Sequence, residues 1–381
     1  MAAIASYFSD FLSEIRLTES QVEDCITGHS TLRKRLLEDE DLSTIIVDTF
    51  LQGSYRRSTA VRPSNGNKLT DVDVIVVTSL DRFFTTPQEA LNKFKPFLQK
   101  HYRGKYEPQG RSWGIKLSYV ALDLVPTSAP SESAKSMLKS ASVTTVKTLS
   151  EAEDWALKRS WKPEEERPAS NSFYKTLAEE KEWQSEPLWI PDRDAEQWDQ
   201  TDPLSQIVVT RSKNRACNRH FVNVVKCLKW WRNTQKPTPK YPRSYPLEHL
   251  TWTCCPDGIR SVAEGVVQAL EQIRDRYSVQ AANKTTPFLP DHGVPSHNVL
   301  HRVSGDDWSA FHAIVTEAAE LARKAFNEED IRKSAILWKR LFGDKFPDPP
   351  AESDKGGGNK SDQGGFTPRQ GVSIIGGGRF G

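Results

Sequence analysis

The sequence predicts a mixed α/β sheet covered by helices, followed by an all-helical second part. Short apolar runs of the kind that form strands lie before residue 128. After residue 204, long stretches carry apolar residues at helical spacing instead. The chain has 381 residues, which is enough for two domains of ordinary size that share a cleft.

The composition is that of a soluble globular protein, with 37% hydrophobic and 27% charged residues. The net charge of +2 does not predict a large nucleic-acid surface, and it favours small phosphorylated substrates. No apolar run approaches the length of a membrane span, and the first residues lack the pattern of a signal peptide. We therefore expect a cytoplasmic protein with no membrane partner. The five cysteines are odd in number and scattered, which favours reduced thiols.

The N-terminal region is helical by pattern. Thr18, with Gln21 three residues later, forms the signature of a capping box. A further helix is expected to start near Ser30 or Thr31. Residues 45–51 then read as a strand that leads into a Gly-Ser turn.

The turn consists of Gln52, Gly53 and Ser54, and it suits a phosphate. Glycine lets the backbone approach a ligand closely, while the serine hydroxyl and backbone N–H groups can donate to phosphate oxygens. A short helix over residues 55–61 would direct its N-terminus at the same phosphate.

Two carboxylates lie two residues apart at the start of the strand predicted at residues 72–78. Asp71 and Asp73 share one face, because side chains repeat every second residue on a strand. Two adjacent carboxylates repel each other and lose solvation, so the arrangement has no structural advantage. A divalent cation such as Mg²⁺ explains it, since hard oxygen atoms are its preferred ligands. The alternative is an acidic hairpin that is merely solvated.

A third carboxylate is expected from a neighbouring strand. After an amphipathic helix that starts at Pro87 and runs through Leu98, residues 113–119 read as strand material that leads to the strand of Asp123. A Gly-Ser turn, an Asp-x-Asp strand and a later lone Asp, in this order, resemble the active site of polymerase-β-like nucleotidyltransferases. Two metal ions would then clamp the attacking and leaving oxygens of an in-line displacement.

Residues 128–203 differ in composition from the preceding part and are rich in Pro, Ser, Glu and Lys. Disordered chains are poor in aromatic residues, so the tryptophans here argue against disorder. We expect a long, partly helical insertion that packs over the catalytic core, with these residues as packing anchors: Trp155, Trp161, Trp183, Trp189 and Trp198.

The second part is predicted to be helical over residues 204–233, 259–282 and 308–342. Lys226 and Lys229 lie three apart, so they share one helix face, which could be a solvated basic face. Ser244 and Tyr245 follow in the next segment. Lysine and serine can hold a triphosphate tail, and a tyrosine ring can stack on a base.

The folded body is expected to end near Pro347, where a run of prolines stops any helix. We therefore expect a nucleotidyltransferase core with N-terminal helices and the insertion over residues 1–203, a helical lobe over 204–347 and a flexible Gly-rich tail over 348–381. The tail ends in Gly381, and this arm resembles the C-termini of ubiquitin-like proteins. Gly381 is expected to be conjugated to a partner amine or thiol, with an E1/E2-like ligase as partner.

The chain as a whole resembles the bacterial cGAS/DncV-like nucleotidyltransferases (CD-NTases), most closely their clade D. The resemblance covers nearly the whole chain and rests on these motifs: Gln52-Gly53-Ser54, Asp71-Val72-Asp73, Leu122 to Pro126, Lys229 to Arg232, Ser244 to Glu248, Trp338 to Gly343, Ile190 to Arg193 in the insertion, and the Arg379-Phe380 ending. It implies a polymerase-β-like lobe with a mixed sheet and a helical second lobe, with the active site in the cleft.

The resemblance also implies an activity. Members of the family make cyclic oligonucleotide second messengers in anti-phage (CBASS) systems, and clade D is associated with a cyclic trinucleotide of two adenylates and one guanylate. ATP and GTP would be the substrates, and the product would activate a downstream effector. The chain shows no zinc ribbon and no strong basic excess, so activation by DNA is not expected.

The resemblance assigns roles residue by residue. Two Mg²⁺ ions, or Mn²⁺ in their place, would be held by the three aspartates. The turn residues would contact the donor phosphate, Lys229 and Ser244 would hold the triphosphate, and Tyr245 would stack on the base. Lys226 lies on the same helix face as Lys229 and is a further candidate for nucleotide binding.

Two other functions fit parts of the pattern. An RNA-tailing or CCA-adding nucleotidyltransferase would use the same carboxylates on a polynucleotide acceptor, but it would favour a basic stripe that the net charge of +2 supports little. A non-catalytic nucleotide-binding module would be expected to lack a carboxylate, whereas all three are present.

Overall fold

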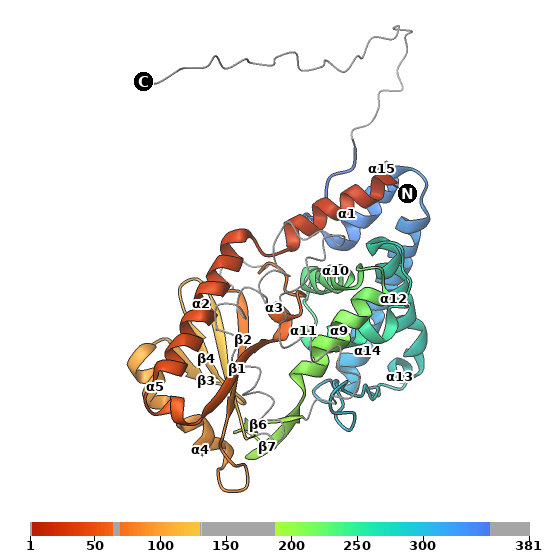
Figure 1. The fold of residues 1–381 in the computed structure, drawn as a ribbon. Helices are drawn as coiled ribbons and strands as arrows, with labels where there is room; N and C mark the ends of the chain where they lie inside the picture. Colours follow the sequence, from red (N-terminus) through yellow and green to blue (C-terminus); the bar gives the residue numbers. More distant parts are fainter. Residues whose placement is uncertain (1, 64–68, 130, 132–186, 351–381) are drawn as a thin grey trace, which may run out of the picture. The chain divides into compact units, whose positions relative to one another are not determined.

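The strands predicted before residue 128 form one five-stranded sheet (Figure 1). The computed structural model describes residues 2–63, 69–129, 131 and 187–350. Strand order is β1-β2-β5-β4-β3, in which β2 and β5 are parallel and the other neighbours antiparallel. The mixed sheet is therefore confirmed. Its strands are β1 Ile46–Gln52, β2 Asp71–Thr78, β3 Tyr106–Pro108, β4 Trp113–Lys116 and β5 Ala121–Thr127.

Alternation along β2 gives the sheet two apolar faces. Val72, Val74 and Val76 are fully buried in the larger of the two apolar clusters on the sheet, which includes residues of α2 (Glu19–Glu38). Ile75 and Val77 point the other way, into a smaller cluster that includes residues of β5 and β6. The two aspartates of β2 lie on this second face, at the start of the strand. The apolar residues beyond them fix which face the carboxylates occupy.

The capping box at the start of α2 is confirmed, because Thr18 Oγ1 accepts from Gln21 N at 3.2 Å and Gln21 Oε1 accepts from Thr18 N at 3.0 Å. The expected new helix near residue 30 is wrong, since α2 runs without a break through that point. Gly28 does not break it. Its position lacks space for a side chain, because an added Cβ would lie 2.6 Å from Val120 Cγ1.

The helix expected from Pro87 to Leu98 is divided in two, α4 Pro87–Asn92 and α5 Lys95–His101. Pro96 explains the division, because it has no N–H to donate to the carbonyl four residues earlier. Leu91 of α4 and Phe97 and Leu98 of α5 belong to the same apolar cluster as residues of α2. The predicted amphipathic pattern is therefore confirmed, but not its continuity.

The described end of the expected insertion is a hairpin, β6 Leu188–Asp192 with β7 Gln197–Thr201. In this part polar turn residues separate two short extended runs. The expectation of a partly helical insertion falls mainly on residues outside the described ones. Trp198 Nε1 donates to the Thr85 carbonyl at 2.9 Å, and Arg82 lies 4.1 Å from the Trp189 ring centre. These two tryptophans are packing anchors, as predicted. The expectations for Trp155, Trp161 and Trp183 lie outside the described residues.

The long helix expected over residues 204–233 is also wrong. The structure has α9 Pro203–Ala216 and α10 Phe221–Thr234, separated at Asn218 and Arg219. Both residues have a positive φ, 50° and 65°, which ends a right-handed helix. The helical spacing of apolar residues continues across the break, so the sequence pattern does not reveal where the first helix ends.

The other long helices are divided as well. Asp330 caps the second member of its pair by accepting from Lys333 N at 3.0 Å, so the break there has a clear local cause. The remaining helices are α11 Ser244–Cys254, α12 Val262–Arg276, α13 Ser278–Ala282, α14 Gly305–Asn327 and α15 Ile331–Phe342.

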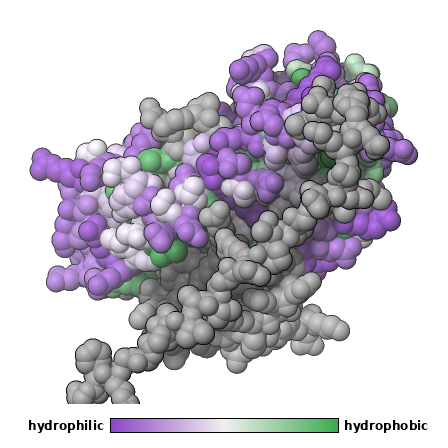
Figure 2. Space-filling model, turned by 90° about the horizontal axis from the view of Figure 1, so that it is seen from above, coloured by the Kyte–Doolittle hydropathy of each residue, from purple (hydrophilic) through white to green (hydrophobic). Residues whose placement is uncertain are grey.

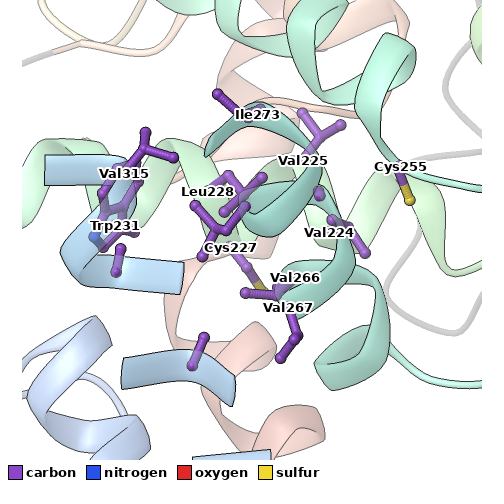
Figure 3. Packing of buried hydrophobic residues seen from close by; sticks show 14 of the residues in the cluster. Val224, Val225, Cys227, Leu228, Trp231, Cys255, Val266, Val267, Ile273 and Val315 are labelled. Carbon is purple, nitrogen blue, oxygen red and sulfur yellow. The ribbon is translucent and has the colours of Figure 1, made fainter. Parts of the chain in front are cut away.

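The largest apolar cluster holds these helices together. Figure 3 shows residues of α10 and α12, among them Val225 and Val267, interleaved in it. The N-terminal helix α1, Ala2–Ile15, belongs to this cluster too. Its Phe8 meets Trp338 of α15 edge to face, with ring centres 4.9 Å apart. Although the expected boundary counts residues 1–203 as the nucleotidyltransferase part, α1 packs with the helical part.

The described residues as far as Pro349 form one compact unit. The expectation of a flexible tail lies outside the described residues. On the face shown in Figure 2, the described residues are mainly hydrophilic, with scattered hydrophobic ones. In the part of the chain that the structure describes, no helix is long and apolar enough to cross a membrane.

The packing of α1 on α15 generates a stability prediction. Trp338→Ala should lower the free energy of unfolding by about 3 to 5 kcal/mol, because it leaves a cavity among Phe8 and Phe342. Chemical denaturation of the purified protein measures the change. Ile336→Ala on the same helix is the control, since Ile336 is 46% exposed. Equal losses from the two variants would contradict the packing described here.

Candidate active site

The register of β2 against β5 brings three carboxylates together. Asp73 lies directly opposite Asp123 on the parallel neighbour, and Asp71 precedes Asp73 by two residues on the same face. One carboxylate oxygen of each residue lies within 4.8 Å of the others. Among the described residues, these three form the group of acidic side chains that lie close enough together to bind one metal ion. The sequence prediction of a shared face and a neighbouring strand is confirmed.

Burial raises the pKa of all three carboxylates, and neighbouring carboxylates add to the shift at Asp71 and Asp123. Removal from water and repulsion by the other two aspartates raise the pKa of Asp71 to about 8. Loss of solvation and Asp73 raise the pKa of Asp123 to about 7, although Gln109 Nε2 donates to Asp123 Oδ1 at 3.0 Å. Burial raises the pKa of Asp73 too, while Arg57 and Lys229 act against that shift. The site therefore favours a positive charge among its carboxylates.

The Gly-Ser turn lies against this cluster. Gln52 pairs with Asp73 across β1 and β2, and Gly53 follows with a φ of 76°. A Cβ at Gly53 would lie 1.8 Å from Asp73 Oδ2, so only glycine leaves the carboxylate its place. Ser54 is half-buried, and its carbonyl accepts from Thr59 N at 2.9 Å. The Gly-Ser turn therefore lies directly beside Asp73, and its contact with a phosphate stays a prediction.

The short helix after the turn differs from the one predicted. It is α3, Gly53–Arg56, rather than residues 55–61. Tyr55 is buried in the sheet's larger cluster, which ties the helix down at its start. The chain then leaves the helix at Arg57, so that residue points toward the helical part.

A buried ion network joins this segment to the helical part. Glu248 of α11 accepts from Arg57 Nε at 3.1 Å and from Lys229 Nζ at 2.8 Å. The side chains of Arg57, Glu248 and Lys229 are 4%, 6% and 8% exposed. Thr59 completes the network, because its hydroxyl donates to Glu248 Oε2 at 2.8 Å and its carbonyl accepts from Lys229 at 3.1 Å. The two cations lower the pKa of Glu248 to about 2.

The other residues predicted to bind nucleotide lie around this network. Ser244 is exposed at the start of α11, 3.5 Å from Glu248 Oε1. Tyr245 donates its hydroxyl to Asp291 Oδ2 at 2.8 Å, and its ring lies 5.1 Å from the Arg57 guanidinium carbon. Lys226 has no ion-pair partner among the residues that the structure describes. Burial and the charges of Arg16 and Lys229 lower its pKa to about 7.

Four residues of the site were missed by the sequence prediction: Arg57, Thr59, Gln109 and Glu248. Arg57 and Thr59 directly follow the Gly-Ser turn, so their position in the sequence could have indicated that they belong to the site. Glu248 lies one helical turn after Ser244, which is a weaker indication of the same kind. Nothing in the sequence indicated Gln109, because the β3–β4 connection alone brings it to Asp123.

The donor set fits a divalent cation. Three carboxylates with elevated pKa supply hard, anionic oxygens on two adjacent strands of the sheet, and Gly53 leaves the Asp73 carboxylate its place. A bound cation would offset the repulsion that raises these pKa values. It would also stabilise charge that develops on a phosphoryl group.

Comparisons with known proteins agree with this geometry. Residues 1–143 match the model of the Second Messenger Oligonucleotide or Dinucleotide Synthetase domain. A Salmonella paratyphi B protein, named as a probable cyclic AMP-AMP-GMP nucleotide synthase, is 47% identical over 98% of this chain and 99% of its own. A cyclic AMP-AMP-GMP synthase of Enterobacter hormaechei is 46% identical over 92% of this chain and 94% of its own.

The fold has solved counterparts. The GTP-bound form of Vibrio cholerae DncV superposes with a TM-score of 0.60 at 12% identity, over 91% of this chain and 96% of that one. This likeness establishes the polymerase-β-like fold with its helical second part. Together with the identity to the two synthases along nearly the whole chain, it shows that the protein belongs to the bacterial cGAS/DncV-like nucleotidyltransferases.

Proposed function

We propose that the protein condenses two molecules of ATP and one of GTP into a cyclic AMP-AMP-GMP trinucleotide. The observation that carries the proposal is the carboxylate cluster beside the Gly-Ser turn, in a chain 46–47% identical to two proteins named for this product. In each step a hydroxyl of one nucleotide would displace pyrophosphate from the next. The product would then act on an anti-phage effector.

Two Mg²⁺ ions, or Mn²⁺, would be held by Asp71, Asp73 and Asp123, and they would bring the attacking hydroxyl and the leaving phosphate into line. The protein itself has to position the substrates. Gly53 leaves the Asp73 carboxylate its place beside the turn, and the Ser54 hydroxyl and the backbone N–H groups of the turn would donate to a donor phosphate, with Gln52 next to them. The positive charge near Asp73 supports the placement of a triphosphate on this side.

The helical part would hold the rest of the nucleotide. Ser244 and Lys226 are the available phosphate donors, because Ser244 is exposed and Lys226 lacks an ion pair within the described chain. Lys229 would contribute its charge from within the Glu248 network. Tyr245, held by Asp291 and Arg57, would stack on a base.

The first test is product formation. Wild-type protein with labelled ATP, GTP and Mg²⁺ should yield a phosphatase-resistant product, because a cyclic oligonucleotide has no terminal phosphate. Asp73→Asn should abolish it while the protein stays folded, since the metal site loses a ligand. Asp81→Asn, in the exposed loop after β2, is the matched control. Normal synthesis by folded Asp73→Asn would exclude the metal assignment, and labelled RNA instead of a cyclic product would indicate a tailing enzyme.

The pKa of Asp123 gives a pH prediction. A carboxyl whose pKa is about 7 in the folded state and about 4 when unfolded destabilises the fold increasingly as pH rises between these values. In metal-free buffer, Asp123→Asn should therefore raise the melting temperature more at pH 8.5 than at pH 5. Mg²⁺ should stabilise the wild type at pH 8.5 and have little effect on the variant. An equal difference at both pH values would contradict the raised pKa.

We also propose that Gly381 is conjugated to a partner amine or thiol by an E1/E2-like ligase. A terminal glycine leaves its carboxylate unhindered for adenylation and thioester transfer. Mass spectrometry of the protein co-expressed with its neighbouring genes should show an adduct on the wild type. Gly381→Glu should lack the adduct and keep basal synthesis in vitro. A wild-type C-terminus that is always a free carboxylate, with the ligase present and active, would exclude conjugation.

A further inference from the structure

Glu248 is a buried carboxylate that receives two cations from different parts of the fold. Arg57 follows the Gly-Ser turn of the sheet, whereas Lys229 belongs to α10 of the helical part. The hydroxyl of Thr59 donates to the same oxygen as Arg57. Each oxygen of Glu248 therefore has a charged donor and a neutral one, since the Ser244 hydroxyl donates to Oε1 at 3.5 Å.

Burial of these three charged side chains is energetically unfavourable. Burying a carboxylate and two cations costs several kcal/mol of solvation for each charge, and replacing buried ion pairs by apolar residues is often neutral or stabilising. The apolar cluster around α10 and α12 shows that this chain packs apolar side chains well nearby. The network is therefore better explained by a role in the site than by stability.

The geometry relates Glu248 to the metal ligands through its partners. The Asp73 carboxylate lies against Gly53 of the Gly-Ser turn, and the Arg57 N–H donates to the Gly53 carbonyl at 3.1 Å, so the Glu248 network begins directly after that turn. Arg57 also donates to Gln206 Oε1 at 3.4 Å and lies against the Tyr245 ring. Glu248 is the group that fixes the direction of both cations. Without its charge, two buried cations would face each other with no anion between them.

We propose that Glu248 is a positioning residue for nucleotidyl transfer, which holds Arg57 and Lys229 beside the metal-binding carboxylates. The inference rests on the proposed nucleotidyl-transfer function. Glu248 itself does not touch the reacting atoms. Its negative charge sets where the two positive charges lie, and they in turn define the place of the substrate phosphates.

Two substitutions separate this role from packing. Glu248→Gln keeps the shape of the side chain and removes its charge, while Glu248→Asp keeps the charge and shortens the side chain. If charge positions the cations, the Gln variant should lose kcat by about tenfold or more. It should also need more Mg²⁺ for half-maximal rate, and the Asp variant should keep more activity than the Gln variant. A role in packing alone predicts the reverse order and an unchanged Mg²⁺ requirement.

The control is an ion pair of the helical part away from the site. Glu271→Gln breaks the contact of Glu271 with Arg323, in which Arg323 Nε donates at 2.7 Å, and it should leave kcat and the Mg²⁺ requirement unchanged. If Glu248→Gln does not fold, Thr59→Val replaces it as the test, because it removes one donor to Glu248 and keeps every charge. This variant should lower kcat and raise the Mg²⁺ requirement in the same direction, by a smaller factor.

The outcomes are distinct. Wild-type kcat and Mg²⁺ dependence in folded Glu248→Gln, or in Thr59→Val where the Gln variant is unfolded, would overturn the positioning role. So would a Gln variant more active than the Asp variant. In each of these cases the wild type still makes product, so the proposed function stands. A wild type that makes no product from any nucleotide would contradict the proposed function instead.

Discussion

The repulsion among three carboxylates on two adjacent strands is the constraint on which the rest of the site depends. Parallel pairing of β2 with β5 places Asp73 opposite Asp123, and both side chains are half-buried, so water screens their repulsion only in part. Nearby features lower the cost of that arrangement. Gly53 leaves the Asp73 carboxylate its space, and Gln109 donates to Asp123. The repulsion that remains among the carboxylates is unfavourable, and a bound divalent cation would offset it.

Positive charge near these carboxylates comes from residues that also join the sheet to the helical part. Arg57 and Lys229 supply positive charge near Asp73, and Glu248 holds both of them. Because Arg57 follows the Gly-Ser turn, and Lys229 and Glu248 belong to helices α10 and α11, the network ties this turn to the helical part. The link is polar and directional, unlike the apolar clusters within each part. It therefore fixes orientation more than it adds stability.

The N-terminal helix has a related role. Its apolar residues pack with α15 at the far end of the chain, although α2, which follows directly, covers the sheet. The first 38 residues thus contribute to both apolar cores. Arg16 lies at the junction, where its Nη2 donates to Asn223 Oδ1 of α10 at 2.9 Å. The connection between the two parts is accordingly made at more than one point of the sequence.

The sequence alone determined the local chemistry. Strand alternation set Asp71 and Asp73 on one face, Thr18 and Gln21 capped α2, and the Gly-Ser turn preceded the acidic strand, because each of these depends on residues near in sequence. Periodicity also identified the helical part, but it did not reveal the breaks at Pro96 or at Asn218 and Arg219. Apolar spacing can continue across a change of backbone direction, so periodicity does not report it.

Only the tertiary structure decided the partners of the buried charges. The register of β2 on β5 and the contact between Arg57 and Glu248, 191 residues apart, follow from how distant segments pack. For the same reason Lys229, which the sequence suggested as a free phosphate donor, is held by Glu248, whereas Lys226 is not. Long-range electrostatic pairing depends on the whole fold, and a local pattern carries no information about it.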